Sequence, residues 1–282
     1  MSFMATLINE HNNMNSNASM PFAEYRGGGK TVKSFGSMTS RWDAEWIGSE
    51  DVSSSLVSNE NWLSIQRAIQ KGGRVLEAGC GIAKWVAFLS KAGYEAHGLD
   101  YSKVAIERSL SLWPELRLAR GDLRAMSYED NFFDAVVSFG AVEHDINGPD
   151  AALAEMHRVL RPGGILYCTV PCMNWIRRAG YLHLQNWVVR NSLIRRLTGR
   201  QPDVEFFEYV FTPREYLRHL KKAGFSIKEL IPLSPYCIET KGPVRRRLIQ
   251  ALHRRLPWCQ AHMMAAICLK VPTESSDAYA KA

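Results

Sequence analysis

Hydrophobic residues in the middle of the chain form short runs that alternate with amphipathic segments. Apolar runs with the length of buried strands cover residues 74–77, 95–99, 116–120, 133–138 and 165–170. Between them, segments with the apolar spacing of helices cover residues 83–91, 102–112 and 151–160. This alternation predicts βαβ units, and therefore an α/β domain with a parallel sheet and helices on both faces.

The regular alternation is interrupted after the fifth of these strands. Residues 172–212 are rich in aromatic residues and arginine, and they predict a helical insertion that would form a lid over the site. The pattern resumes with a helix at 213–223 and strands at 225–233 and 263–271. An amphipathic helix with a basic face is predicted at 244–256, between the last two strands.

The sequence on either side of the domain has a different character. Residues 1–39 begin with a polar, Asn-rich stretch and end in a glycine-rich one, and they predict a disordered leader and linker. Residues 40–72 predict two N-terminal cap helices. The domain itself then spans 73–271, and residues 272–282 predict a tail.

Composition adds limits to this picture. Hydrophobic residues make up 46% and charged residues 22% of the 282 residues, so a sizeable core can form. No apolar run reaches the roughly 18 residues that cross a bilayer, and the N-terminus lacks the basic and then apolar order of a secretory signal. We therefore expect a cytoplasmic protein with reduced cysteines. Cys168 and Cys172 do not form a CxxC pair, and no metal site is expected.

A glycine-rich loop follows the first strand of the domain. It reads Glu77-Ala-Gly-Cys-Gly-Ile-Ala83, and its glycines let the backbone turn sharply and approach a ligand closely. Many nucleotide sites use such a loop, but a dinucleotide-binding loop begins with glycine, where this chain has Glu77. Asp100 ends the next strand, where a carboxylate can accept both hydroxyls of a ribose. The loop and Asp100 together indicate a nucleoside site without room for a pyrophosphate.

From residue 73 to 171 the chain resembles the class I S-adenosylmethionine-dependent methyltransferases, in particular the small-molecule branch related to the ubiquinone-biosynthesis methyltransferases. The segments that carry this resemblance, in order, are residues 74–83, 98–102, 120–123, 132–144 and 157–166. The resemblance implies a Rossmann-like fold with a mostly parallel seven-stranded sheet and an antiparallel last strand. It also implies S-adenosylmethionine as the methyl donor and S-adenosylhomocysteine as the product.

The resemblance assigns the glycine-rich loop to the methionine part of the cofactor. Glu77 would bind the amino group, and the backbone of Gly79, Cys80 and Gly81 would line this part of the site. One departure is visible, since Ala83 replaces the usual third glycine of the family's first motif. We expect a methyl group to be tolerated there, at the start of a helix.

The adenosine part is assigned to the ends of the next two strands. By resemblance, Asp100 would hold the ribose hydroxyls and Tyr101 would pack on the adenine. Asp122 would accept a hydrogen bond from the adenine amine, with Leu123 beside the ring. From the sequence alone, either aspartate could instead cap a helix or a turn, and Tyr101 could be a core residue.

Methyl transfer from a sulfonium is a direct displacement, so the protein mainly has to align the reacting atoms. The resemblance places Phe139 and Gly140 beside the sulfonium. A base is needed only if the acceptor carries its proton at neutral pH. His144 follows the fourth strand and is the candidate catalytic base. The alternative is that Glu143 and His144 only brace the loop that follows.

The acceptor side is assigned from aromatic and polar residues outside the sheet. Candidate acceptor-binding residues in the insertion are Trp175, Tyr181 and His183. Trp42 and Trp46 lie on one face of the first cap helix and would close the site from the other side. Alternatively, the aromatic residues pack the insertion down and its arginines point to water.

The helix predicted at 244–256 leaves two alternatives open. Its basic face could contact an anionic membrane, or a lipid-linked or phosphorylated acceptor. It could equally cover the sheet with its basic face in water. No nucleic-acid partner is expected, because the net charge is only +7 and no RNA-binding module is recognisable. The oligomeric state is left open.

The sequence therefore predicts a methyltransferase that acts on a small organic acceptor at oxygen, nitrogen or carbon. One alternative is methylation of a lipid-linked or cell-surface glycan precursor. The alternative of another class is a non-catalytic scaffold that binds S-adenosylmethionine. Turnover distinguishes the two classes, since a scaffold would never form S-adenosylhomocysteine.

Overall fold

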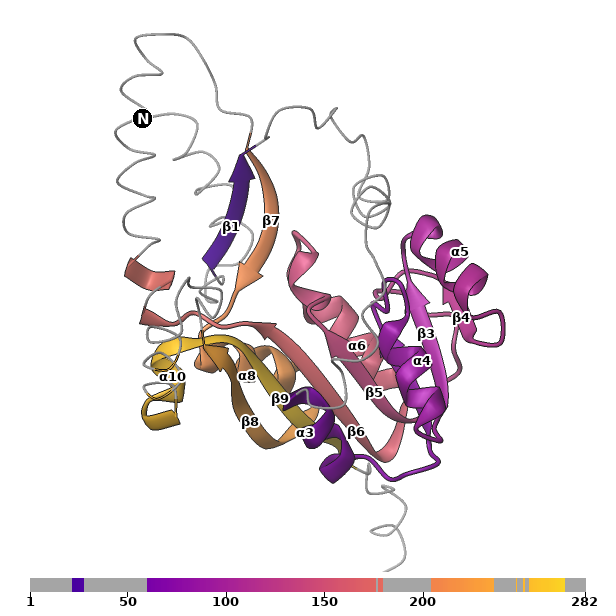
Figure 1. The fold of residues 1–282 in the computed structure, drawn as a ribbon. Helices are drawn as coiled ribbons and strands as arrows, with labels where there is room; N and C mark the ends of the chain where they lie inside the picture. The colour runs from indigo at the N-terminus through magenta and orange to yellow at the C-terminus, as the bar shows by residue number, and fades with distance from the viewer. Residues whose placement is uncertain are drawn as a thin grey trace, which may run out of the picture.

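A computed structural model describes residues 22–27, 60–175, 177–179, 204–235, 247, 251 and 254–271. Its main sheet has seven strands in the order β4-β3-β2-β5-β6-β9-β8 (Figure 1). Their bounds are β2 (Arg74–Ala78), β3 (Glu95–Asp100), β4 (Arg117–Arg120), β5 (Phe133–Phe139), β6 (Leu160–Pro171), β8 (Phe225–Pro235) and β9 (Ala261–Lys270). Only β9 runs antiparallel to its neighbours in this sheet. The predicted fold class, a mostly parallel sheet with an antiparallel last strand, is confirmed.

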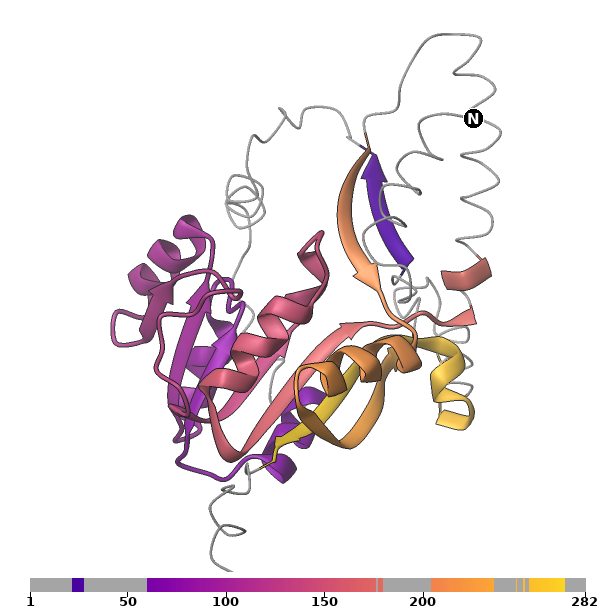
Figure 2. The ribbon, with the colours of Figure 1, turned by 180° about the vertical axis from the view of Figure 1, so that it is seen from behind.

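Helices cover both faces of the sheet, as the alternation predicted (Figure 2). They are α3 (Glu60–Ala68), α4 (Lys84–Lys91), α5 (Lys103–Leu112), α6 (Asp150–Val159), α8 (Pro213–Lys222) and α10 (Pro257–Gln260), with a 3-10 helix η1 (Val142–His144). Successive residues of β2 enter different cores, because side chains alternate along a strand. Leu76 packs in one core with Met156 of α6, and Val75 packs in the other with Leu89 of α4.

The direction of the strand order changes between β2 and β5. From β2 the chain proceeds outward to β3 and β4, and it then returns to the other side of β2 with β5 and β6. In an open α/β sheet, ligands bind at the carboxyl ends of the strands beside such a switch point. The glycine-rich loop after β2 and the loop after β5 both lie at this edge.

Two predictions about the chain outside the main sheet need correction. β1 (Phe22–Gly27) is a strand within the predicted disordered leader, and it pairs antiparallel with β7 (Val204–Val210). β7 in turn belongs to the insertion that was predicted to be helical. Each strand obtains its hydrogen bonds from a partner far away in the sequence, so local periodicity gave no sign of the pairing.

Other predictions fall outside the described residues. These are the cap helix with Trp42 and Trp46, the part of the insertion at 180–203, and most of the basic helix at 244–256, of which Arg247, Ala251, Arg254 and Arg255 are described and helical. Among the helices of the described residues, none combines the length and the apolar character needed to span a membrane.

The C-terminal part of β7 and the residues after it are anchored to the main domain. Tyr209 is buried, and its hydroxyl donates to the carbonyl of Ile146 at 2.7 Å. The backbone N–H of Phe211 donates to the Pro171 carbonyl at 3.0 Å, at the end of β6. These contacts hold β7 beside η1, over the carboxyl edge of the sheet (Figure 1).

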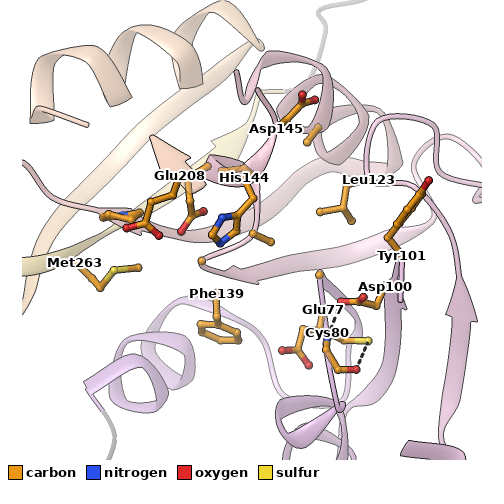
Figure 3. A pocket seen from close by; sticks show the side chains of 18 of the residues that line it. Glu77, Cys80, Asp100, Tyr101, Leu123, Phe139, His144, Asp145, Glu208 and Met263 are labelled. Carbon is orange, nitrogen blue, oxygen red and sulfur yellow. Dashed lines mark hydrogen bonds between the residues drawn. The ribbon is translucent and has the colours of Figure 1, made fainter. Parts of the chain in front are cut away.

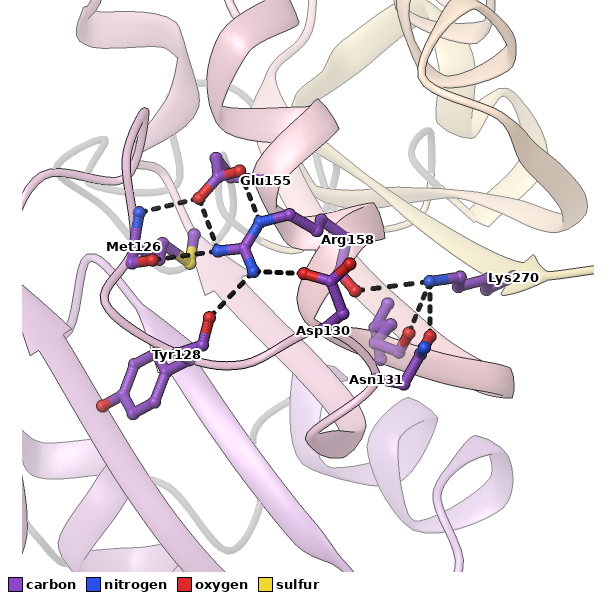
Figure 4. A network of polar contacts seen from close by, with 8 residues as sticks. Met126, Tyr128, Asp130, Asn131, Glu155, Arg158 and Lys270 are labelled. Carbon is purple, nitrogen blue, oxygen red and sulfur yellow. Dashed lines mark hydrogen bonds and ion pairs between the residues drawn. The ribbon is translucent and has the colours of Figure 1, made fainter.

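Arg158 of α6 fastens the connection between β4 and β5 to the domain (Figure 4). Its guanidinium donates to the backbone carbonyls of Met126 at 2.9 Å and Tyr128 at 2.8 Å. It also forms ion pairs with Glu155 and Asp130, at 2.7 Å each. Glu155 completes the network by accepting from the backbone N–H of Met126 at 2.7 Å. One side chain therefore satisfies several groups of a segment without regular secondary structure.

Replacing Arg158 by methionine should lower the free energy of unfolding by about 2–3 kcal/mol. The substitution keeps the apolar stem but leaves two carbonyls and two carboxylates without their charged donor. Urea unfolding would measure the change. Arg67→Met is a matched control, because Arg67 forms only an exposed ion pair with Glu229 at 3.8 Å and should change stability by less than about 0.5 kcal/mol. Equal losses in the two variants would contradict a clamping role for Arg158.

Candidate active site

A cavity of about 760 Å³ opens at the carboxyl edge of the sheet, beside the switch point. This volume is within the range of sites that bury a small organic ligand. Figure 3 shows side chains from β2, β3, β5 and η1 directed toward it. The predicted cofactor and catalytic residues all line this one cavity, namely Glu77, Gly79, Cys80, Gly81, Asp100, Tyr101, Asp122, Leu123, Phe139, Gly140 and His144.

Backbone hydrogen bonds to β3 shape the glycine-rich loop. The N–H groups of Gly79 and Cys80 both donate to the Leu99 carbonyl, at 2.8 and 3.0 Å. Gly79 has a φ of +81°, and a Cβ atom on it would lie 2.4 Å from the Cβ of Ala141. Glycine is therefore required at this position both by conformation and by space.

Ala83 holds its methyl group at the start of α4, but in a backbone conformation that carries strain. It precedes α4 as the N-cap residue, with φ 52° and ψ 28°, in the left-handed region. A residue with a Cβ atom is strained there by about 1–2 kcal/mol. Its side chain is fully buried, and burial of the methyl group offsets part of this strain. The position thus has a left-handed backbone conformation, which glycine adopts more readily than alanine.

Glu77 points its carboxylate into the protein beneath the loop. The side chain is 3% exposed, and Oε2 accepts from the Val86 N–H at 3.0 Å. Burial raises the pKa of Glu77 well above its usual value, and the nearby Asp100 carboxylate adds to this. Because Glu77 also lines the cavity, a cationic group bound there would stabilise its ionised form.

Asp100 joins the glycine-rich loop to the start of α5. Its Oδ2 accepts from the Gly81 N–H at 2.7 Å, and its Oδ1 accepts from the Ser102 N–H at 2.8 Å. Ser102, rather than Asp100, caps α5, through a hydrogen bond from Ala105 at 3.0 Å. Tyr101 is 38% exposed, so it is a surface residue at the mouth of the cavity and not a core residue.

Asp122 is held by its neighbour Arg124. The guanidinium contacts both carboxylate oxygens at 2.7 to 3.1 Å, and the Arg124 N–H adds a hydrogen bond of 2.8 Å. These hydrogen bonds lower the pKa of Asp122. The carboxylate is therefore ionised and fixed in orientation. A carboxylate has about four acceptor positions, so this geometry still allows a ligand to donate to Asp122.

Aromatic packing fixes the residue at the end of β5. The ring of Phe139 stacks on Trp85 of α4, with the ring centres 4.6 Å apart and 19° between the planes. Gly140 follows with a φ of +69°, which turns the chain toward η1. The two stacked rings form a flat wall of the cavity, and Figure 3 shows the ring of Phe139.

Charged and polar residues from four separate parts of the chain form the end of the cavity away from the glycine-rich loop, its deeper end. His144 donates from Nδ1 to the Phe207 carbonyl at 2.8 Å, and its ring packs edge-on against the Phe207 ring. Arg177 lies 3.8 Å from Glu208 and 3.4 Å from the ring of His262. Burial raises the pKa of Glu143 to about 8, with a further contribution from the Glu208 carboxylate.

Of the five candidate acceptor residues, the structure describes only Trp175. Trp175 is 69% exposed and does not line the cavity, so the structure places it away from the site. Its helical neighbour Arg177 points inward instead, because residues two apart lie on different faces of a helix. Trp42, Trp46, Tyr181 and His183 lie outside the described residues.

Sequence reasoning also missed cavity residues. Glu208 and His262 line the cavity, and neither was identified as a site residue. His262 could have been found, because an antiparallel last strand begins at the edge where the parallel strands end. Glu208 offered no comparable signal, since its strand was predicted to be helix.

Comparison with known proteins gives a family match for the region that contains most of this cavity. Residues 76–168 match the family described as methyltransferase domain. Demethylmenaquinone methyltransferase of Staphylococcus epidermidis is 39% identical over 110 residues, which are 36% of this chain and 44% of that protein. The enzyme of the same name from Staphylococcus carnosus is also 39% identical over 110 residues, with the same coverage of both chains. The chain thus spans less than half the length of these curated relatives.

Solved structures resemble the fold over a longer stretch. A SAM-dependent methyltransferase of Methanosarcina mazei has a TM-score of 0.54 and 20% identity, over 74% of this chain and 98% of that chain. The [4+2]-cyclase SpnF has a TM-score of 0.50 and 18% identity, over 76% of this chain and 80% of that chain. At these identities the likeness shows the fold alone, and the fold hosts more than one kind of reaction.

Residues 76–168 therefore match a methyltransferase domain, and with this fold and site the chain resembles the class I S-adenosylmethionine-dependent methyltransferases. Over this region the chain resembles, in particular, the demethylmenaquinone methyltransferases.

Proposed function

We propose that this protein binds S-adenosylmethionine and transfers its methyl group by direct displacement to a small organic acceptor. The observation that supports this most strongly is the meeting of Glu77, the glycine-rich loop and Asp100 at one cavity beside the switch point. These are the residues that a methyltransferase domain uses for its donor in the resemblance described above. S-adenosylmethionine, when bound, supplies a methyl group on a positively charged sulfur.

The residues present fit this donor. Gly79 packs so closely against Ala141 that a Cβ atom on Gly79 would overlap it. At this position the loop therefore lines the cavity with its backbone and not with a side chain. The buried carboxylate of Glu77 suits the ammonium group, and Asp100 suits the ribose hydroxyls. Tyr101 and Leu123 would flank the adenine, near Asp122. Cys80 and Gly81 would complete the methionine side.

The other end of the cavity would receive the acceptor beside Phe139 and Gly140. His144 donates from Nδ1 to a carbonyl, which leaves the lone pair of the neutral ring on Nε2. This arrangement supports a role as base for an acceptor hydroxyl or a related acidic group. The same hydrogen bond also braces η1 against β7, so both roles proposed for His144 are compatible with its geometry.

The names of the matched relatives favour an acceptor related to a quinone, in its reduced form. The flat wall of Phe139 and Trp85 suits a planar ring next to the sulfonium. A lipid-linked or glycan acceptor has no comparable support among the described residues. A non-catalytic scaffold is also less well supported, because the cavity extends beyond the donor residues to Glu143, Glu208 and His262.

Calorimetry with S-adenosylmethionine, followed by assay of S-adenosylhomocysteine with reduced demethylated quinones, tests the proposal. We expect saturable binding of one donor molecule per chain and product formation with at least one planar hydroxylated acceptor. Donor binding without turnover on a broad acceptor panel would favour the scaffold. Absence of donor binding would contradict the proposal altogether.

A further inference from the structure

Three potential metal ligands meet at the deeper end of the cavity. They are Glu143 and His144 of η1 and Glu208 of β7, and one ligand atom from each lies within 4.8 Å of the other two. The two elements are joined by the hydrogen bond from His144 to Phe207 and by the Tyr209 anchor. Figure 3 shows His144 and Glu208 converging on the same part of the cavity.

Glu143 provides an independent indication that this end binds a cation. Its side chain is 1% exposed, and its Oε2 accepts no hydrogen bond from any of the described residues. A buried carboxylate oxygen without a donor is costly, typically by several kcal/mol if the group is charged. Because Glu143 lines the cavity, a positively charged ligand in the cavity could supply the missing partner.

His144 has the orientation that metal-binding histidines have. Its Nδ1–H donates to the backbone carbonyl of Phe207 at 2.8 Å. A hydrogen bond of this kind fixes the ring and directs the lone pair to Nε2, which is the usual arrangement around a metal-bound imidazole. The hydrogen bond that orients a metal-binding imidazole is therefore already present in the fold.

The charges of the residues at this end of the cavity also favour a bound cation. Arg177 approaches Glu208 at 3.8 Å, and the side chains of both residues are largely buried. Among the described residues, the Arg177 guanidinium pairs with Glu208, while burial and the Glu208 carboxylate disfavour the ionised form of Glu143. A cation bound between Glu143 and Glu208 would stabilise both carboxylates in their ionised form.

We propose that Glu143, His144 and Glu208 bind a divalent first-row cation such as Mn²⁺ or Zn²⁺. Two carboxylates and one imidazole suit these ions, and three protein ligands leave positions open to the cavity. An acceptor hydroxyl could occupy an open position, where the cation would lower its pKa. His144 would then act as a metal ligand and would not also be the base, because Nε2 has a single lone pair. Only this effect on the acceptor rests on the proposed methyl transfer, because cation binding itself does not require it.

The site is tested directly by removing metal ions from the protein with a chelator and then titrating the protein with Mn²⁺ while calorimetry monitors binding. We expect one saturable site per chain, with affinity at least tenfold lower in Glu208→Gln and in His144→Ala. Asp145→Asn is the matched control, because it removes an acid that follows His144 directly and pairs with Arg124 instead. Its Mn²⁺ affinity should change less than threefold.

Donor affinity in the presence of EDTA separates this proposal from the proposed function. Unchanged S-adenosylmethionine binding in Glu208→Gln would show that the variant is folded and that its loss of Mn²⁺ binding is local. Absence of saturable Mn²⁺ binding to the unmodified protein would overturn the cation site, even if methyl transfer is found. Equal Mn²⁺ affinity in Glu208→Gln, His144→Ala and the unmodified protein would overturn it as well.

Discussion

Replacing Gly79 by alanine is expected to lower the free energy of unfolding by about 2–4 kcal/mol and to weaken S-adenosylmethionine binding. Two effects add at this position. The residue has a φ of +81°, which strains any side chain, and a Cβ atom would lie 2.4 Å from the Cβ of Ala141. The overlap can be relieved only by moving the loop away from the end of β5, which would distort the donor side of the cavity. Urea unfolding and calorimetry would measure the two consequences.

Two further variants separate these effects. Gly72 has nearly the same φ, +84°, but among the described residues no atom beyond its chain neighbours lies within 4 Å of the Cβ position. Gly72→Ala should therefore show the conformational strain alone, about 1–2 kcal/mol, with donor binding intact. The double variant Gly79→Ala with Ala141→Gly should recover the part due to overlap. If Gly79→Ala were no worse than Gly72→Ala, close packing against Ala141 would not explain the glycine.

Replacing Asp100 by asparagine should weaken S-adenosylmethionine binding by about 100-fold or more. The carboxylate orients the loop through Gly81 and, in the proposed function, accepts the ribose hydroxyls as well. Each charge-assisted hydrogen bond contributes about 1.5–3 kcal/mol, and two such losses account for this factor. The amide keeps the shape of the side chain but removes its charge and one acceptor. Calorimetric titration with S-adenosylmethionine would measure the change.

Glu95→Gln is the matched control for Asp100→Asn. Glu95 is an acid at the opposite end of the same strand, where it pairs with Arg74 at 3.1 Å. Its substitution should leave donor affinity within about twofold of the unmodified protein, since it lies at the edge of the sheet away from the cavity. A similar loss in both variants would indicate a general effect of charge on the sheet, and Asp100 would then have no specific part in binding the donor.

Much of the donor side of this site could be predicted from local pattern. The apolar runs and their spacing predicted the strands and helices of residues 74–170. The predicted bounds lie within a few residues of the observed ones, except that β6 begins earlier than predicted. Parallel strands joined by helices end at a common edge, so Glu77, Asp100 and Phe139 had to lie near one another once the strands were recognised. What the pattern could not show is the backbone conformation of Ala83, which depends on how the loop meets α4.

The acceptor side depended on contacts that no local pattern contains. β1 and β7 are far apart in the sequence, at residues 22–27 and 204–210, and neither was predicted to be a strand. Glu208 reaches Glu143 and His144 only because Tyr209 and Phe211 anchor its strand to the main domain.

The sequence by itself therefore determined the fold class and the common edge at which the glycine-rich loop, Asp100 and Phe139 meet, because these follow from periodicity along neighbouring segments. The donor roles proposed for these residues come from the family resemblance. Only the tertiary structure decided which side chains complete the deeper end of the cavity. Its members are separated by more than sixty residues at η1 and β7, so their meeting depends on the path of the intervening chain. Local sequence carries little information about that path, because a distant partner supplies the hydrogen bonds and the packing that determine it.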